Sequence, residues 1–325
     1  MPSRPPAPRA DGRARSQWVD LEGPTHYVDH GGPATGPVLV CVHGLGGSHL
    51  NWAAIAPRLT QTCRMLAIDL PGHGRTRAHG RSTSVTADQR LLHRFVTEVA
   101  GSPVVLVGNS MGAMVSILAA HAHPETVAGL VLVDPALPQL RVARPDPLVA
   151  GSFLAYAAPG IGRAFLAGRR HRRSPEQAVA EMLRLCCVDP SRVPPDVVTA
   201  SVELARERRT FRGVDSEFLT AARSLMRVLA LHWSYEAKMR EIHVPVLLLQ
   251  GEKDRLVSLA SARAAAADNP LWRFEIAYGV GHVPQLEVPD WTVEAILDWL
   301  ATDGRIAAIA SADRSGQTLP PGPTP

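Results

Sequence analysis

A serine at the centre of a glycine-bounded turn is the first candidate for chemistry in this chain. Gly108-Asn109-Ser110-Met111-Gly112 has the form GxSxG, follows the apolar run Val104 to Val107, and precedes a helical pattern from Met114. A sharp strand-to-helix turn exposes its apical hydroxyl, and side chains at the two glycines would collide with neighbouring backbone. Because a serine hydroxyl needs a base to become a good nucleophile, the pattern predicts that Ser110 attacks substrate with help from distant residues.

Two later loops supply the acid and the base that such a serine needs. The apolar run Val246 to Gln250 ends in Gly251-Glu252-Lys253-Asp254, which places Asp254 after a predicted strand. A second strand-like run, Trp272 to Tyr278, leads into Gly279-Val280-Gly281-His282. We predict that His282 is the base and that Asp254 orients it. The order serine, aspartate, histidine is that of α/β-hydrolases and differs from the orders in the other serine-triad folds.

Five short sequence blocks support a wider resemblance to a known family. The chain resembles the α/β-hydrolase superfamily, in the branch with an inserted cap, over about residues 18 to 300. The agreement of the blocks in order, spacing and position relative to strands supports the resemblance. The blocks are HGLGGS at His43 to Ser48, DLPGHG at Asp69 to Gly74, GNSMG at Gly108 to Gly112, GEKDRLVS at Gly251 to Ser258 and GHVPQLE at Gly281 to Glu287.

The resemblance implies an oxyanion hole made of two main-chain amides. HGLGGS follows the run Val38 to Val42, where the family builds half of this hole. Leu45 would supply one amide, and Met111, directly after the nucleophile, would supply the other. His43 is expected to brace the loop by hydrogen bonds. No proton transfer is expected from it.

Asp134 is an alternative triad acid. It closes the run Leu130 to Val133, and some members of the fold take their acid from that position. The pattern around Asp254 matches the commoner acid loop, so Asp254 is preferred.

Strand-like runs recur along the chain, and helical stretches separate most of the later ones. This alternation predicts a mostly parallel, eight-stranded sheet with helices on both faces, the α/β-hydrolase fold, and an antiparallel pair at the early edge. The reacting groups should then gather at the carboxyl ends of the strands. The runs are Trp18 to Leu21, His26 to Asp29, Val38 to Val42, Met65 to Leu70, Val104 to Val107, Leu130 to Val133, Val246 to Gln250 and Trp272 to Tyr278.

The predicted organisation has two core parts, one insertion and two tails. Strand signals disappear after Pro138 and helical patterns take over, so residues 138–240 are predicted to form a helical cap over Ser110 with an apolar pocket beneath it. The core is expected over residues 17–137 and 241–302. Residues 1–16 are expected to be a disordered basic tail, and residues 303–325 a flexible C-terminal tail.

The positive charge is concentrated in two segments. The net charge is +4, yet residues 1–16 carry four arginines against one aspartate, and residues 163–173 carry five arginines and no acid. The remainder is therefore mildly acidic, which argues against a nucleic-acid partner. We expect the arginine-rich segment to be a solvated surface of the cap, with attraction of anionic substrates or of a lipid surface as the alternative. Contact with a membrane surface is not expected.

Metal and phosphate motifs are missing from the sequence. The histidines and cysteines show neither HExxH nor paired CxxC spacing, and HGLGGS lacks the spacing of a phosphate-binding loop. We expect hydrolysis without a metal or other cofactor. The four cysteines, Cys41, Cys63, Cys186 and Cys187, show no disulfide framework, which indicates a reducing compartment. With no long apolar run and no apolar signal core, the protein is expected to be cytoplasmic.

These features predict a serine hydrolase that cleaves a carboxylic ester of an apolar small molecule or lipid through an acyl-enzyme. Ser110 argues against dehalogenases and epoxide hydrolases, which carry aspartate at that position. Three alternatives stay open. The first is hydrolysis of carbon–carbon bonds in ring-fission products, although such enzymes usually have tryptophan where this chain has Val283. The second is perhydrolysis or acyl transfer by the same triad, and the third is a ligand-binding receptor on a hydrolase scaffold.

Overall fold

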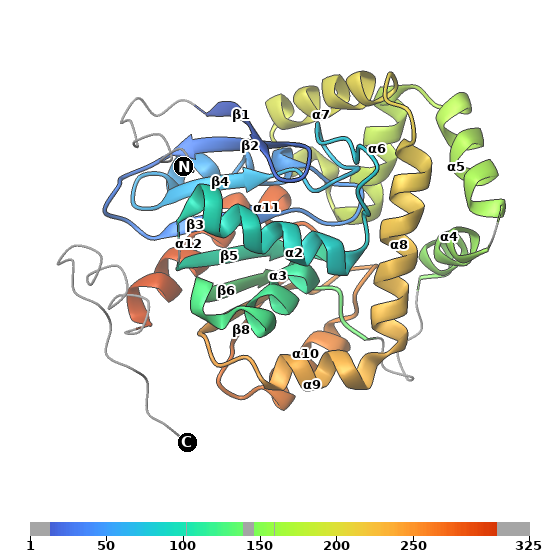
Figure 1. Ribbon diagram of the computed structural model, residues 1–325. Helices are drawn as coiled ribbons and strands as arrows, with labels where there is room; N and C mark the ends of the chain where they lie inside the picture. The colour runs from blue at the N-terminus through green and yellow to red at the C-terminus, as the bar shows by residue number, and fades with distance from the viewer. Residues whose placement is uncertain (1–13, 102, 139–145, 159, 304–325) are drawn as a thin grey trace.

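Eight strands form one sheet, ordered β1-β2-β4-β3-β5-β6-β7-β8 (Figure 1). The computed structural model describes residues 14–101, 103–138, 146–158 and 160–303. β2 pairs antiparallel with β1 and with β4, and all other neighbours are parallel. The predicted eight-stranded, mostly parallel sheet with an antiparallel edge is confirmed. The strands are β1 (Arg15–Asp20), β2 (Pro24–Gly31), β3 (Val38–Val42), β4 (Arg64–Ile68), β5 (Val104–Asn109), β6 (Val127–Val133), β7 (Val246–Gly251) and β8 (Arg273–Ala277).

Helices cover both faces of the sheet, and none in the described ranges has the length and apolar character needed to cross a membrane. The core helices are α1 (Ala56–Leu59), α2 (Val85–Phe95), α3 (Met111–Ala122), α9 (His232–Arg240), α10 (Leu259–Asp268), α11 (Pro284–Glu287) and α12 (Pro289–Thr302). We call the helices α4 (Pro147–Ala157), α5 (Ile161–Arg172), α6 (Pro175–Cys186), α7 (Pro195–Arg208) and α8 (Val214–Ala230) the cap.

The cap is the stretch between β6 and α9. No strand occurs there among the described residues. The predicted cap boundary at residue 240 includes α9, but Tyr235 and Met239 of this helix lie in the same buried cluster as α3. The apolar side chains of α9 are therefore buried against the core helix α3, beside Ala221 and Leu225 of α8.

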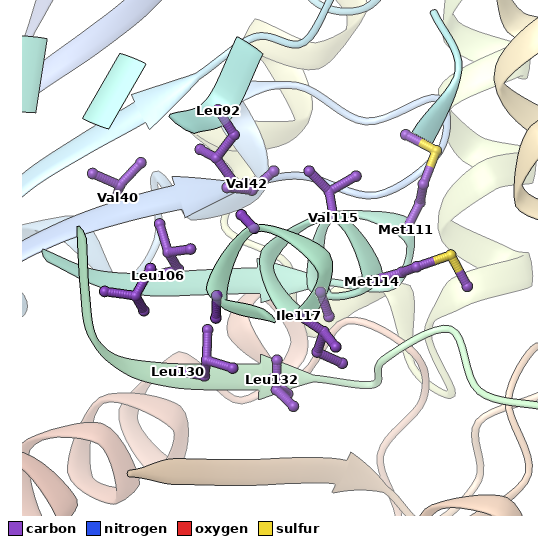
Figure 2. Close-up of a cluster of buried hydrophobic side chains, with 14 of the residues drawn as sticks. Val40, Val42, Leu92, Leu106, Met111, Met114, Val115, Ile117, Leu130 and Leu132 are labelled. Atoms are coloured by element: carbon purple, nitrogen blue, oxygen red, sulfur yellow. The ribbon is translucent and has the colours of Figure 1, made fainter. Parts of the chain in front are cut away.

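Side chains of the central strands alternate between two apolar layers, because successive residues of a strand point to opposite faces. One layer packs Val42, Leu106 and Leu132 with α3, whose Met114 and Ile117 belong to the same buried cluster (Figure 2). The alternate residues of the same strands pack on the other face with α1 and α12. Both faces are covered, which explains why these strands are continuous apolar runs in the sequence.

The first strand begins earlier than predicted. β1 starts at Arg15, so Arg15 and Ser16 belong to the sheet and not to the tail expected over residues 1–16. An edge strand is held by backbone bonds on one side and leaves most of its side chains in solvent, so it produces no apolar run in the sequence. Residues 1–13 and 304–325, which make up the rest of both predicted tails, lie outside the described residues.

One buried carboxylate joins the edge strands to the loop after β3. Asp69 accepts hydrogen bonds from Nδ1 of His26 at 2.7 Å and from Nδ1 of His49 at 2.9 Å. It also accepts the amides of His49 at 2.7 Å and Arg75 at 2.9 Å. Burial by itself would raise the pKa of Asp69, but the hydrogen bonds from the two histidines outweigh it and hold this pKa below its usual range. The ionised form therefore stabilises the fold.

Replacing Asp69 by Asn should lower the free energy of unfolding by about 3 kcal/mol at pH 7, because an amide cannot accept from all these donors. A depressed native pKa gives stability that is present above the unfolded pKa, about 3.9, and lost as the pH falls below it. The difference between wild type and variant in urea unfolding should therefore shrink below about pH 4. The exposed Asp196→Asn is the control, and equal stability of Asp69→Asn and wild type at pH 7 would contradict the account.

Candidate active site

Ser110 lies at the apex of the turn between β5 and α3. Its backbone has φ 55° and ψ −118°, a conformation that residues with side chains rarely adopt. The flanking glycines permit the turn: a Cβ on Gly112 would lie 2.1 Å from the carbonyl oxygen of Val42, and one on Gly108 would lie 2.5 Å from Cα of Ala113. The turn therefore has the steric form of a strained elbow that presents a serine at the carboxyl end of the sheet.

His282 and Asp254 form a buried hydrogen-bonded pair. Nδ1 of His282 lies 2.7 Å from Oδ2 of Asp254. The other carboxylate oxygen accepts the amides of Leu256 at 2.7 Å and Val257 at 3.1 Å, and Gln250 donates to Oδ2 at 3.2 Å. These bonds fix the carboxylate as the acceptor of the Nδ1 proton. The Nε2 atom of the ring is then the one that remains available as a base.

Asn109 connects the serine turn to the histidine loop. Its Nδ2 donates to the carbonyl oxygens of Val133 and His282, both at 3.1 Å. The amide of Ser110 donates to Val133 at 3.0 Å, and the carbonyl of Ser110 accepts the amide of Ala136 at 3.1 Å. The sequence pattern indicates no role for Asn109, because the middle positions of GxSxG carry no requirement of their own. In the structure, its side chain fixes the loop of His282 beside the end of β5.

Asp134 lies near this pair without taking the place of Asp254. It follows β6, and its Oδ1 accepts the amide of Gly251 at 2.8 Å. Burial, and then the negative charge of Asp254, raise the pKa of Asp134 well above its usual range. A carboxyl with a raised pKa carries negative charge less readily, and Nδ1 of His282 bonds Asp254, whereas Asp134 accepts the amide of Gly251. The geometry therefore favours Asp254 over Asp134 as the partner of His282.

Two backbone amides near the serine are candidates to bind a ligand oxygen. Within the part of the chain that the structure describes, the amides of Leu45 and Met111 have no protein acceptor. Met111 begins α3, and Leu45 lies in the loop after β3. This loop approaches the serine closely, since a Cβ on Gly44 would lie 3.0 Å from Cβ of Ser110. Unpaired amides at a helix start and on an adjacent loop are the elements of an oxyanion hole.

His43 holds the loop that carries the Leu45 amide. Its Nδ1 lies 2.8 Å from the carbonyl oxygen of Gly44, and its Nε2 accepts the amide of Leu70 at 3.1 Å. Burial lowers the pKa of His43, so the ring is neutral, with a proton on Nδ1 and a lone pair on Nε2. The expectation that His43 braces the loop by hydrogen bonds is confirmed.

Aromatic side chains of the cap reach down to the same loop. Leu45 packs against a cluster around Tyr156 and Leu219. The ring of Phe218 lies over Gly46, where a Cβ would be 3.3 Å from the ring, and the rings of Tyr156 and Phe218 are 5.2 Å apart. The cap therefore places an apolar wall beside the loop after β3.

Two sets of polar contacts hold the cap against the core beside the site. No sequence pattern indicated either set. On the histidine side, the amide of His282 donates to the carbonyl oxygen of Cys186 at 2.6 Å. The carboxylate of Glu287, only 2% exposed, accepts the amides of Gly281 at 2.9 Å, Val188 at 3.2 Å and Asp189 at 2.9 Å. One buried carboxylate thus joins the end of α6 to the loop of His282.

On the opposite side, Arg208 at the end of α7 reaches the turn after β4. Its Nη1 donates to the carbonyl oxygen of Gly74 at 2.6 Å and its Nη2 to that of Gly72 at 2.7 Å. Arg75 forms an ion pair with Glu207 at 3.0 Å in the same region. Because these partners lie more than a hundred residues apart, no local sequence pattern could indicate them.

Two groups of described residues bring three potential metal ligands within 4.8 Å of one another: His26, His49 and Asp69, and Asp134, Asp254 and His282. The nitrogen–oxygen distances within them, 2.7 Å for His26 to Asp69 and 2.7 Å for His282 to Asp254, are hydrogen-bond lengths. Ligand atoms around a tetrahedral zinc ion stand roughly 3.3 Å apart. Both groups have hydrogen-bond geometry and would have to open to hold an ion.

Comparison with known proteins identifies the family. The chain matches the alpha/beta hydrolase family over residues 39–295. The chain belongs to this family. The hydrolase is 26% identical to the monoacylglycerol lipase ABHD6 of Mus musculus over 279 residues, which cover 85% of this chain and 79% of that protein. The predicted superfamily is therefore confirmed.

Solved structures share the fold of this alpha/beta hydrolase. A lipase from Acinetobacter baumannii superposes with a TM-score of 0.71 at 22% identity, covering 89% of this chain and 91% of the lipase. The haloalkane dehalogenase DatA from Agrobacterium tumefaciens superposes with a TM-score of 0.74 at 21% identity, covering 90% of this chain and 97% of the dehalogenase. Proteins with different reactions thus share this fold, and the reaction has to be argued from the side chains.

Replacing Glu287 by Gln should destabilise the hydrolase by about 1–3 kcal/mol, because the amide group can accept from the three backbone donors through one oxygen only. Urea unfolding would measure the change. The control is Glu294→Gln on α12, whose side chain is exposed and lies 3.7 Å from Arg58. If both variants unfold like the wild type, Glu287 does not hold the cap to the histidine loop.

Proposed function

We propose that this hydrolase is a serine esterase that cleaves carboxylic esters with an apolar acyl or alkyl group. The observation that carries the proposal is the 2.7 Å hydrogen bond between Nδ1 of His282 and Oδ2 of Asp254. This bond leaves Nε2 as the proton acceptor, and Asn109 ties the histidine loop to the turn of Ser110. The strained serine turn and the two unpaired amides supply the other parts that acyl transfer requires.

In the proposed mechanism, Oγ of Ser110 attacks the ester carbonyl while Nε2 of His282 takes the hydroxyl proton. Asp254 stabilises the imidazolium, and the amides of Leu45 and Met111 stabilise the negative oxygen of the tetrahedral intermediate. The carbon–oxygen bond to the alcohol then breaks, and His282 gives the proton to the departing alcohol. Water repeats the sequence on the acyl-enzyme and releases the acid.

The apolar wall above the oxyanion loop supports the substrate class. Phe218 and Leu45 lie beside the position of the ester carbonyl, so the group attached to that carbonyl would meet hydrocarbon and aromatic surface. The mouse relative is a monoacylglycerol lipase. Together these observations make glycerol monoesters of fatty acids the first natural substrates to test.

The test is a substrate series with matched variants. Wild type should hydrolyse p-nitrophenyl butyrate and a monoacylglycerol, and Ser110→Ala should lose a factor of about 10⁴ or more in kcat. Asp254→Asn should lose about 10⁴-fold, because the amide no longer holds the Nδ1 proton in place. Asp134→Asn should keep near wild-type kcat, since Nδ1 of His282 bonds Asp254 and not Asp134.

Three results would contradict the assignment. A larger loss for Asp134→Asn than for Asp254→Asn would exchange the roles of the two acids. Faster cleavage of a ring-fission dienone than of any ester would show that carbon–carbon bond hydrolysis is the principal reaction. Full esterase activity in Ser110→Ala would remove the serine mechanism altogether.

A further inference from the structure

The outer surface of the first two cap helices is apolar although it is exposed. Leu154 on α4 and Ile161 on α5 are 72% and 60% exposed. The exposed positions beside them carry small residues at helical spacing, and residues 147–173 contain no aspartate, glutamate or lysine. Exposed apolar surface of this kind marks an interaction site when it is contiguous. The small residues are Gly151, Ala157, Ala164 and Ala167.

Packing within the cap explains only the inner side of these helices. Phe153, Tyr156 and Phe165 point into the cluster that includes Phe218 and Leu45. α4 and α5 lie at the margin of the molecule, beyond α8, with their outer side away from the sheet (Figure 1). The apolar residues on the outer side therefore do not serve the core or the wall over the serine.

Positive charge borders this apolar surface. α5 carries five arginines with the residue that follows it, and three of them form ion pairs: Arg169 and Arg173 with Glu181, and Arg170 with Asp215. The remaining two, Arg163 and Arg172, have no acidic partner among the described residues. An open hollow at the end of α5 is lined by Ala167, Arg170, His171 and Arg209. The surface thus combines protruding hydrocarbon with cations that are not neutralised locally.

We propose that the outer surface of α4 and α5 docks on a lipid bilayer with anionic head groups. Leu154 and Ile161 enter the boundary between head groups and acyl chains, while Arg163 and Arg172 lie at the level of the phosphates. The positive charge favours a bilayer over an apolar protein surface. An apolar protein surface would leave Arg163 and Arg172 without anionic partners, whereas an anionic bilayer supplies a phosphate group for each. This revises the expectation that the protein makes no contact with a membrane surface.

Docking in this orientation has a consequence for catalysis, which rests on the proposed function. The inner sides of α4 and α5 contact the wall above the oxyanion loop. A lipid ester leaving the bilayer would therefore meet the aromatic cluster before it reaches Ser110. Docking should raise turnover of esters in vesicles and leave turnover of soluble esters unchanged.

The experiment is co-sedimentation of the full chain with vesicles of phosphatidylcholine alone and of phosphatidylcholine with phosphatidylglycerol. Wild type should sediment preferentially with the anionic vesicles, and salt should weaken binding. Leu154→Asp with Ile161→Asp, and separately Arg163→Ala with Arg172→Ala, should each weaken vesicle binding about tenfold or more. The matched controls lie outside the cap: Leu271→Asp, where the side chain is 87% exposed, and Arg90→Ala with Arg263→Ala, which should bind like the wild type.

Hydrolysis of soluble p-nitrophenyl butyrate at the wild-type rate would show that all four variants are folded. Esters presented in anionic vesicles should be cleaved more slowly by the two cap variants only. Wild-type sedimentation of both cap variants would overturn the proposal. So would gel filtration showing that Leu154→Asp with Ile161→Asp turns a dimer into a monomer without affecting vesicle binding, because the surface would then join two copies. Absence of any esterase activity in the wild type would refute the proposed function and leave the sedimentation result intact.

Discussion

The contact between the start of α3 and the end of β3 is the constraint on which the site depends. A hydrogen atom is all that fits at Gly112, since a Cβ there would lie 2.1 Å from the carbonyl oxygen of Val42 and 2.5 Å from that of His43. With α3 pressed against this strand, the chain must reverse sharply at Ser110, and the residue takes a strained backbone conformation. The same contact places the unpaired amide of Met111 next to the loop that carries Leu45. One close approach thus places Ser110 and both amides together.

Backbone groups hold the loop of His282 at this point. Asn109 holds the carbonyl of His282, and the amide of His282 donates to Cys186 at the end of α6. Glu287 then joins the same loop to the residues after α6. The histidine is therefore fixed between the core and the cap, so a movement of α6 would change the position of the ring. The position of the cap and the geometry of the catalytic groups are mechanically linked in this fold.

Sequence patterns predicted the features that depend on neighbouring residues, such as buried strands. β3 spans Val38–Val42, as predicted, because a strand buried on both faces is an uninterrupted apolar run. The predicted first strand began too late, at Trp18, because the exposed residues at the start of β1 form no apolar run. The choice between Asp134 and Asp254 stayed open because it depends on distances across three strand ends. The cap contacts of Arg208 and Glu287 were missed for a related reason, since they join residues that are distant in the chain.

A hydrogen-bonded chain of serine, histidine and aspartate away from Ser110 gives the central claim a sharp test. Oγ of Ser16 lies 2.7 Å from Nε2 of His26, which bonds Asp69, yet Ser16 sits on an edge strand and not at a helix start. If activation depends on the strained turn and its amides, a fluorophosphonate probe should form one adduct per chain. Intact mass and peptide mapping should place that adduct on Ser110 and show none in Ser110→Ala. An adduct on Ser16, or no adduct on folded wild-type protein, would contradict the account.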